Sequence, residues 1–246
     1  MAWDKPARHA TITTDNNSKS TQRGVLIWDF PTRLFHWLLV ICFCGSWLTA
    51  EAGFDWTQTH IYFGYCTLGL VLFRILWGFL GNEYARFGQF LKSPLATLKS
   101  ISHLFDRTSD RNAGHSPYSG YAVIFLLYFA LAQAVSGLFI SDDILYSGPY
   151  NPAVSGDLAG TLAWYHHLNF TMFQVMVGIH ILAILWYRLW KGESLVLPMI
   201  TGRKMHNAFK SASNVSPLKA LIVITLCITA IVLLVQLAPE PNLSYF

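Results

Sequence analysis

Charged residues are scarce in this chain. Asp, Glu, Lys and Arg make up 12% of its 246 residues, whereas roughly a quarter is usual in soluble domains. Hydrophobic residues make up 53%, so the composition excludes an ordinary soluble domain and favours a protein of the lipid bilayer. Five apolar segments are long enough to cross about 30 Å of hydrocarbon as helices. They are residues 34–50, 60–81, 118–141, 162–187 and 220–238.

Lysine and arginine are absent from half of the segments that flank these spans. Three segments contain none: residues 51–59, 142–161 and 239–246. The other three contain several Lys or Arg residues: five in residues 1–33, five in residues 82–117 and six in residues 188–219. Because basic residues mark the cytoplasmic side, we expect a multi-pass membrane protein with its N-terminus in the cytoplasm and its C-terminus outside. The net charge of +4 then reflects topology and gives no reason to expect a nucleic-acid partner.

Cysteine is also scarce, and no Cys-x-x-Cys-His motif for covalent haem attachment is present. All four cysteines lie within the predicted spans, where we expect them to pack between helices. The first 23 residues are polar, so no cleavable signal peptide is expected, and the first span would act as its own insertion signal.

The polar and apolar segments divide the chain into three parts. Residues 1–24 are expected to form a disordered cytoplasmic tail. Residues 25–205 are expected to form a four-helix membrane domain, and residues 206–246 a linker and a fifth transmembrane helix. Within the domain, apolar residues recur at intervals of three and four over residues 87–105. This spacing predicts a helix that lies along the cytoplasmic membrane surface, so the predicted fold is an all-α integral membrane bundle.

Four histidines lie inside or at the ends of the apolar spans, where ionisable groups are costly: His36, His60, His166 and His180. His166 and His180 are fourteen positions apart, which places them about 40° apart around a helix and about 21 Å apart along it. His167 would face roughly 140° away from His180, so His166 is the better partner. The depths expected in the membrane pair His36 with His180 near the cytoplasm, and His60 with His166 near the outer surface.

Each pair of histidines could hold a planar cofactor between two helices. Neutral imidazole is a common axial ligand of haem iron, and two such ligands leave no open position, so these haems would carry electrons. Zinc is disfavoured because its ligands converge on one point. Each histidine alone could equally be a hydrogen-bonded helix contact. A haem-free membrane anchor, or a transporter whose histidines relay protons, therefore stays as an alternative.

Three further residues are candidates for cofactor contacts. Arg74 is the only Lys or Arg inside a predicted span, and it would either bind the propionates of the inner haem or extend to the cytoplasmic surface. Arg33, one turn before His36, is a second propionate candidate or a charge that sets topology. Gly64 could let a flat macrocycle approach the backbone, although small residues also serve helix packing.

Several short motifs accompany the histidines. They are Trp28-Asp29-x-Pro31-x-Arg33-x-x-His36-Trp37, His60-x-x-x-Gly64, Arg74-x-x-Trp77-Gly78, Gly137-Leu138-Phe139-Ile140-Ser141-Asp142-Asp143, Gly148-Pro149, His166 with His180, and Thr201-Gly202-Arg203-Lys204. As a set, over about residues 25–205, they resemble the bacterial cytochrome b561 and Ni,Fe-hydrogenase b-type cytochrome family. Two departures are His167, where relatives often have an acid, and the fifth span.

The resemblance implies that four helices hold two b-type haems, ligated by His36, His60, His166 and His180. It implies electron transfer between the quinone pool and a periplasmic redox protein, such as a c-type cytochrome. The alternative within the family is the membrane anchor of an uptake Ni,Fe-hydrogenase. In either case the chain would be an electron-transfer component of a quinone-linked oxidoreductase, and a homodimer is possible.

Overall fold

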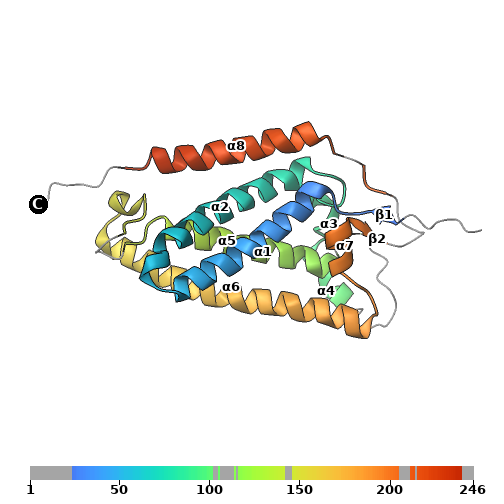
Figure 1. Cartoon of the computed structure of the whole chain (residues 1–246). Helices are drawn as coiled ribbons and strands as arrows, with labels where there is room; N and C mark the ends of the chain where they lie inside the picture. Colours follow the sequence, from blue (N-terminus) through green and yellow to red (C-terminus); the bar gives the residue numbers. More distant parts are fainter. Residues whose placement is uncertain are drawn as a thin grey trace, which may run out of the picture.

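The computed structural model describes residues 24–101, 105, 114, 116–141, 146–204, 211–213 and 215–239. It confirms the all-α membrane bundle with five long apolar helices: α1 (Phe30–Glu51), α2 (Thr57–Leu80), α5 (Pro117–Gly137), α6 (Gly156–Trp190) and α8 (Pro217–Gln236). Figure 1 shows α1, α2, α5 and α6 running side by side, with α8 lying along α2. The tail predicted over residues 1–24 lies, except for Gly24, outside the described ranges.

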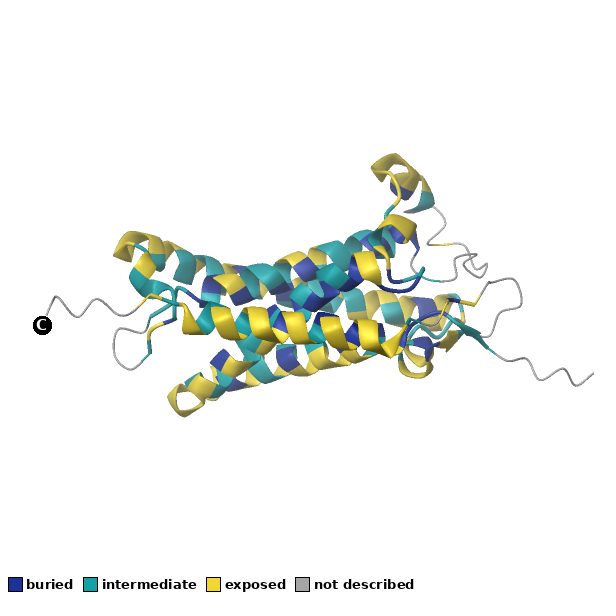
Figure 2. Ribbon diagram, turned by 90° about the horizontal axis from the view of Figure 1, so that it is seen from above, coloured by how far each residue is buried: buried dark blue, intermediate teal, exposed yellow. Residues whose placement is uncertain are grey.

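Large apolar side chains cover the outward faces of these helices. Leu189 on α6 is 82% exposed and Leu221 on α8 is 59% exposed. Figure 2 shows exposed residues spread along the outside of the bundle, while buried residues lie between the helices. Soluble monomers rarely expose so much continuous apolar surface, so this surface suits contact with lipid.

The first turns of three helices are fixed by local caps. The Asp29 side chain accepts a hydrogen bond from the backbone N–H of Thr32 at 2.8 Å, and α1 carries a proline in its first turn. Ser116 and Ser155 cap α5 and α6 in the same way. Such caps satisfy backbone donors that have no partner within the helix, so polar residues directly before the apolar runs determine where the helices begin.

Helix α6 extends well beyond the span predicted over residues 162–187. It has 35 residues, which at about 1.5 Å per residue gives a length of roughly 52 Å. Since the hydrocarbon core is about 30 Å thick, both ends of α6 reach past it. Hydropathy detects only the apolar part of such a helix.

The single surface helix predicted over residues 87–105 is wrong. The structure has two short helices, α3 (Phe87–Phe90) and α4 (Pro94–Ile101), separated by residues 91–93. Pro94 explains the break, because proline disfavours helical geometry in the residue before it and fits well in the first turn of a new helix. Leu95 and Leu98 remain largely exposed on α4, and the location of α4 at a membrane surface stays a prediction.

A two-stranded sheet, called the clasp below, joins the residues before α1 to the residues after α6. The strands β1 (Val25–Leu26) and β2 (Arg203–Lys204) pair antiparallel, and β2 follows α7 (Val196–Thr201). Ile27 and Trp28 both donate backbone hydrogen bonds to the carbonyl of Gly202, at 2.8 and 3.1 Å. Gly202 has a φ of 80°, which a residue with a side chain adopts only at a cost. The chain before α1 is therefore held against the chain after α6.

Beside this clasp lies a buried polar cluster of Asp29, Trp77 and Asn82. Asp29 Oδ2 accepts from Trp77 Nε1 at 3.1 Å and from the backbone N–H of Asn82 at 3.4 Å. Asn82 in turn donates from Nδ2 to the Ile27 carbonyl at 3.1 Å. Buried polar groups need such partners, so the cluster fixes the end of α2 against the start of α1.

Helix α8 packs against α2 and belongs to the same hydrophobic core. Val223 and Cys227 are buried there, and a Cβ added at Gly69 on α2 would lie 3.5 Å from the side chain of Ile231. The loop between α5 and α6, which contains the short helix η3 (Asn151–Ala153), also reaches α8, because Tyr150 donates from its hydroxyl to the Leu234 carbonyl at 2.9 Å.

Candidate cofactor site

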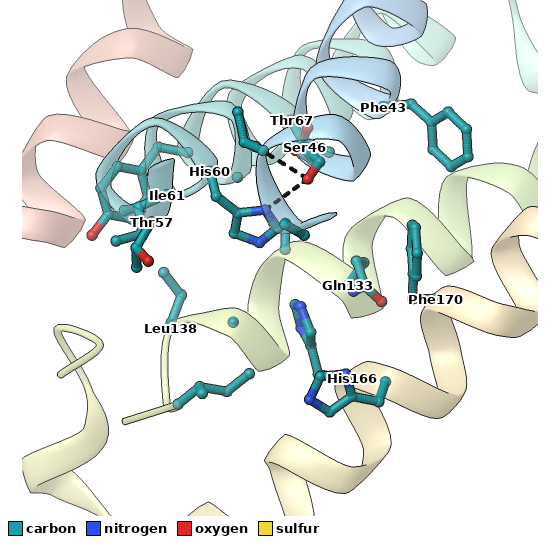
Figure 3. A pocket seen from close by; sticks show the side chains of 18 of the residues that line it. Phe43, Ser46, Thr57, His60, Ile61, Thr67, Gln133, Leu138, His166 and Phe170 are labelled. Atoms are coloured by element: carbon teal, nitrogen blue, oxygen red, sulfur yellow. Dashed lines mark hydrogen bonds between the residues drawn. The ribbon is translucent and has the colours of Figure 1, made fainter. Parts of the chain in front are cut away.

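The structure brings His60 on α2 and His166 on α6 together, as their predicted depths suggested. Their ring centroids are 6.4 Å apart, with an angle of 68° between the ring planes. Both side chains line a cavity of about 480 Å³, and Figure 3 shows them approaching it from opposite helices.

Hydrogen bonds place the proton of the His60 ring on Nδ1 and favour the same tautomer for His166. His60 Nδ1 lies 2.8 Å from the Ser46 carbonyl oxygen, which can only accept, so Nδ1 donates. The Ser136 hydroxyl donates to the carbonyls of Ala132 or Gln133, at 2.7 and 3.1 Å, and its oxygen accepts from His166 Nδ1 at 3.0 Å. Both Nε2 atoms therefore keep a free lone pair, the arrangement typical of histidines that ligate a metal.

The spacing of the two rings suits one iron atom between them. A metal–nitrogen bond of about 2 Å on each side, with about 1 Å more to each ring centre, gives a centroid separation of about 6 Å. A Cβ placed at Gly64 meets no atom of the described residues within 4 Å, so this glycine faces open space at the cavity that it lines. At Gly137 a Cβ would lie 3.3 Å from the His166 ring. These residues fit a flat macrocycle with two axial imidazoles.

His36 on α1 and His180 on α6 form the second predicted pair. The charge of one acts on the other, so the two side chains lie near each other. His36 packs edge-on against Trp37 at 5.1 Å, and its Nδ1 is buried without a hydrogen-bond partner among the described residues. An unpartnered buried ring nitrogen is costly, so the Nδ1 of His36, unlike that of His60 or His166, still needs a hydrogen-bond partner.

His167 lies at the edge of the first cavity rather than across from His60. It is exposed, its ring centroid is 6.1 Å from that of His166, and it also borders the cavity. His166, in contrast, hydrogen-bonds through Nδ1 to the Ser136 hydroxyl oxygen, which orients its ring. The geometry therefore favours His166 as the residue that faces His60.

Arg74 is buried and does not extend to the surface. It is 2% exposed, donates from Nη2 to the Ala85 carbonyl at 3.1 Å, and lies over the Phe87 ring at 4.9 Å. Asp29 is the acidic residue whose charge acts on it. Its Nη1 has no hydrogen-bond partner within the described ranges, which leaves one donor for an anion such as a propionate.

Arg33, a propionate candidate from the sequence, contacts the end of α7 in the structure. Its Nη1 donates to the carbonyl of Ile200 at the end of α7, and a Cβ added at Gly202 would lie 3.2 Å from its Nε. That Nε is buried with no partner in the described part of the chain. The observed contacts thus give Arg33 a role in holding α7 to α1.

The sequence of most of this bundle matches a known family. Residues 27–202 match the prokaryotic cytochrome b561 family. The chain belongs to this family. Similar proteins include probable Ni/Fe-hydrogenase B-type cytochrome subunits of Rhizobium leguminosarum bv. viciae, 23% identical over 80% of this chain and 96% of that protein, and of Azotobacter vinelandii, 24% identical over 75% and 90%. No solved structure matches.

Membership of the cytochrome b561 family makes this chain a multi-pass membrane b-type cytochrome of electron transfer, with haem b as its cofactor. The matched region ends at residue 202 and contains all four histidines. Helix α8 lies beyond it, so the fifth helix is an addition to the part that defines the family.

Three residues of this cytochrome b561 site were missed by the sequence analysis. Ser136 had no signal, because no spacing rule relates it to a histidine 30 positions away. Ser46 acts through its backbone carbonyl, which every residue has. Asp29 could have been found, because an Asp directly before an apolar segment that begins with Phe-Pro is a common helix cap.

Tyr146 closes one side of the cavity from the loop between α5 and α6. Its hydroxyl hydrogen-bonds that of Tyr65 on α2, and burial raises the pKa of Tyr146 above its usual value. Tyr146 therefore stays protonated and neutral over the physiological pH range. Tyr146 supplies this wall without bringing a charge to the cavity.

Proposed function

We propose that this cytochrome b561 family member is a dihaem electron carrier between the quinone pool and a redox protein outside the bacterial inner membrane. The observation that carries the proposal is the His60–His166 pair, with both Nδ1 atoms hydrogen-bonded and both Nε2 atoms free for iron. His36 and His180 would hold the second haem. Along α6, the two ligands His166 and His180 are about 21 Å apart, so the pairs would lie at different depths in the membrane.

The residues of the chain would bind, orient and shield each haem. When bound, haem b supplies reversible one-electron chemistry at its iron. Ser46 and Ser136 would fix the axial rings, while Phe43 and Phe170 exclude water from the cavity. The free Nη1 of Arg74 would neutralise a propionate on the side of the His36–His180 pair. Each pair of histidines would hold one haem, and the chemistry that the haem would supply there is electron transfer.

The partner that the relatives favour is a hydrogenase. One feature supports a partner on the side away from the basic segments. Residues 51–59, 142–161 and 239–246 contain no Lys or Arg, which is typical of segments outside the cytoplasm. The similar proteins from Rhizobium and Azotobacter carry names of Ni/Fe-hydrogenase subunits. We therefore place an iron–sulfur subunit of a hydrogenase ahead of a c-type cytochrome as the electron donor.

Haem quantification in the purified full-length chain tests the proposal. We expect a reduced-minus-oxidised b-type spectrum and two haems per chain. His60→Ala and His166→Ala should each remove the same haem, and His36→Ala the other, while His167→Ala, the matched control, should keep both. A chain without haem after expression with adequate haem supply would contradict the proposal and favour a haem-free anchor or transporter. Copurification of a hydrogenase subunit, or of a c-type cytochrome instead, would decide between the two partners.

A further inference from the structure

Two side-chain amides meet in the apolar interior between α5 and α6. Asn169 on α6 is 2% exposed. Its Nδ2 donates to the Phe129 carbonyl at 3.0 Å and to Gln133 Oε1 at 2.7 Å. Burying polar side chains in a membrane bundle costs free energy, so such residues usually have a structural or functional role. One role of these amides is to join α5 to α6 about one helical turn from His166.

The hydrogen bonds determine which way both amides point. The Phe129 carbonyl only accepts, so the Asn169 atom that faces it is the nitrogen. This nitrogen has two hydrogens, and the second is directed to Gln133, so the Gln133 atom that faces Asn169 is the oxygen. The Gln133 Nε2 group therefore points away from Asn169. Within the described residues, Nε2 has no hydrogen-bond partner.

Gln133 lines the cavity between His60 and His166. Figure 3 shows its side chain between the two histidines and Phe170. The same residue contributes its backbone carbonyl to the Ser136 hydroxyl, at 3.1 Å, which orients His166. Gln133 thus brings a side-chain amide to the cavity wall, with its oxygen held by Asn169.

We propose that Gln133 tunes the haem held by His60 and His166, and that Asn169 positions it for this task; the inference rests on the proposed function. Because Asn169 holds the amide oxygen, the Nε2 group, the positive end of the amide dipole, would be directed toward a haem in the cavity that Gln133 lines. In a low-dielectric cavity this dipole stabilises the reduced form relative to the oxidised form. The amide therefore raises the midpoint potential of this haem and leaves that of the His36–His180 haem unchanged.

Redox titration of the purified, full-length haem-loaded chain tests the inference. Gln133→Leu should shift the midpoint potential of one haem downward while the haem-to-chain ratio stays at the wild-type value. The shifted haem should be the one that is lost in His166→Ala. Gln58→Leu is the matched control, because it makes the same chemical change at an exposed position two residues from His60, and it should shift neither potential.

Asn169→Leu separates the positioning role from plain packing. It frees the Gln133 amide to rotate, so the midpoint potential should shift in the same direction and by less than in Gln133→Leu. In the double variant the potential should equal that of Gln133→Leu alone, since Asn169 acts only through Gln133. Retention of low-spin b-type spectra in all variants shows that the site is folded.

The outcomes distinguish the inference from the proposed function. If the wild-type chain holds both haems and Gln133→Leu leaves both potentials unchanged, the inference is overturned and the proposed function stands. A shift of both haems, or additive shifts in the double variant, would also overturn it, because each points to a general structural change. If the wild-type chain holds no haem, the proposed function itself fails.

Discussion

Replacing Asp29 tests the polar cluster that joins α1 to α2. Asp29 is 6% exposed, and Asp29→Ala removes the cap of α1, which typically contributes about 1 kcal/mol. It also leaves the buried Trp77 Nε1–H without its acceptor, at a cost of about 1–3 kcal/mol. We therefore expect Asp29→Ala to lower the free energy of unfolding by about 2–4 kcal/mol.

Asp29→Asn divides this effect into its two parts. Asparagine caps helices as well as aspartate does, so its Oδ1 can accept from the Thr32 N–H. Its NH2 group would then face Trp77 Nε1–H, and two donors cannot bond each other. Asparagine also removes the negative charge that acts on the buried Arg74. The expected loss is thus the part that depends on the Oδ2 carboxylate oxygen and its charge, at least about 1–3 kcal/mol for the unpaired Trp77 donor.

Unfolding in detergent, titrated with SDS and followed by circular dichroism and tryptophan fluorescence, measures these differences. Asp55→Ala is the matched control, because Asp55 is exposed at the other end of the bundle and its removal should change the free energy of unfolding by less than about 0.5 kcal/mol. If Asp29→Ala is no more destabilising than Asp55→Ala, the hydrogen bonds of the cluster do not stabilise the fold by the expected amount. If Asp29→Asn is as stable as the wild type, the Trp77 part is refuted.

Three further changes probe the site and the helix packing. Ser136→Ala removes the hydroxyl oxygen that accepts from His166 Nδ1, and we expect it to weaken haem retention about 10- to 100-fold, measured by transfer of haem to apomyoglobin. Ser46→Ala keeps its backbone carbonyl and should retain haem normally, and equal retention in both would contradict the role of Ser136 in orienting His166. Gly64→Phe should fill the cavity and remove one of two haems, whereas Gly64→Ala should keep both in a pyridine haemochrome assay. Cys42 and Cys66 hydrogen-bond across α1 and α2, so mild oxidation should give an intramolecular disulfide detectable by mass spectrometry; a chain that stays reduced would contradict the facing of these two helices.

The histidine pairing could be predicted because it depends on two regular quantities. Helical periodicity places His166 and His180 on one face, and the alternating direction of the spans sorts the four histidines by depth. These quantities do not depend on the details of packing. The bundle and the facing of His60 and His166 therefore follow from the chain itself, and the partnership of His36 with His180 stays a prediction supported by their electrostatic contact.

Other features could not be read in this way, for identifiable reasons. The His60 and His166 rings are oriented by a backbone carbonyl and by a serine on another helix, and neither leaves a pattern in the sequence. Helix α6 continues past the apolar residues because a capped helix is also stable in the interface. The surface helix was predicted from apolar spacing alone, and Pro94 should have counted against it. The amide orientation of Gln133 depends on Asn169 and on one carbonyl, which only a structure can place.

The clasp at Gly202 has a consequence for biosynthesis. The residues that it joins, Ile27 and Gly202, are roughly 175 positions apart. At a synthesis rate of about 5–20 residues per second, roughly 10–35 s would pass between the synthesis of Ile27 and that of Gly202. The hydrogen bond between them could form only after this time. During this interval the haem-binding helices could separate enough to admit their cofactors, and translation of α7 would then close the bundle around them. A ribosome paused between α6 and α7 should accordingly hold a chain that still exchanges haem freely.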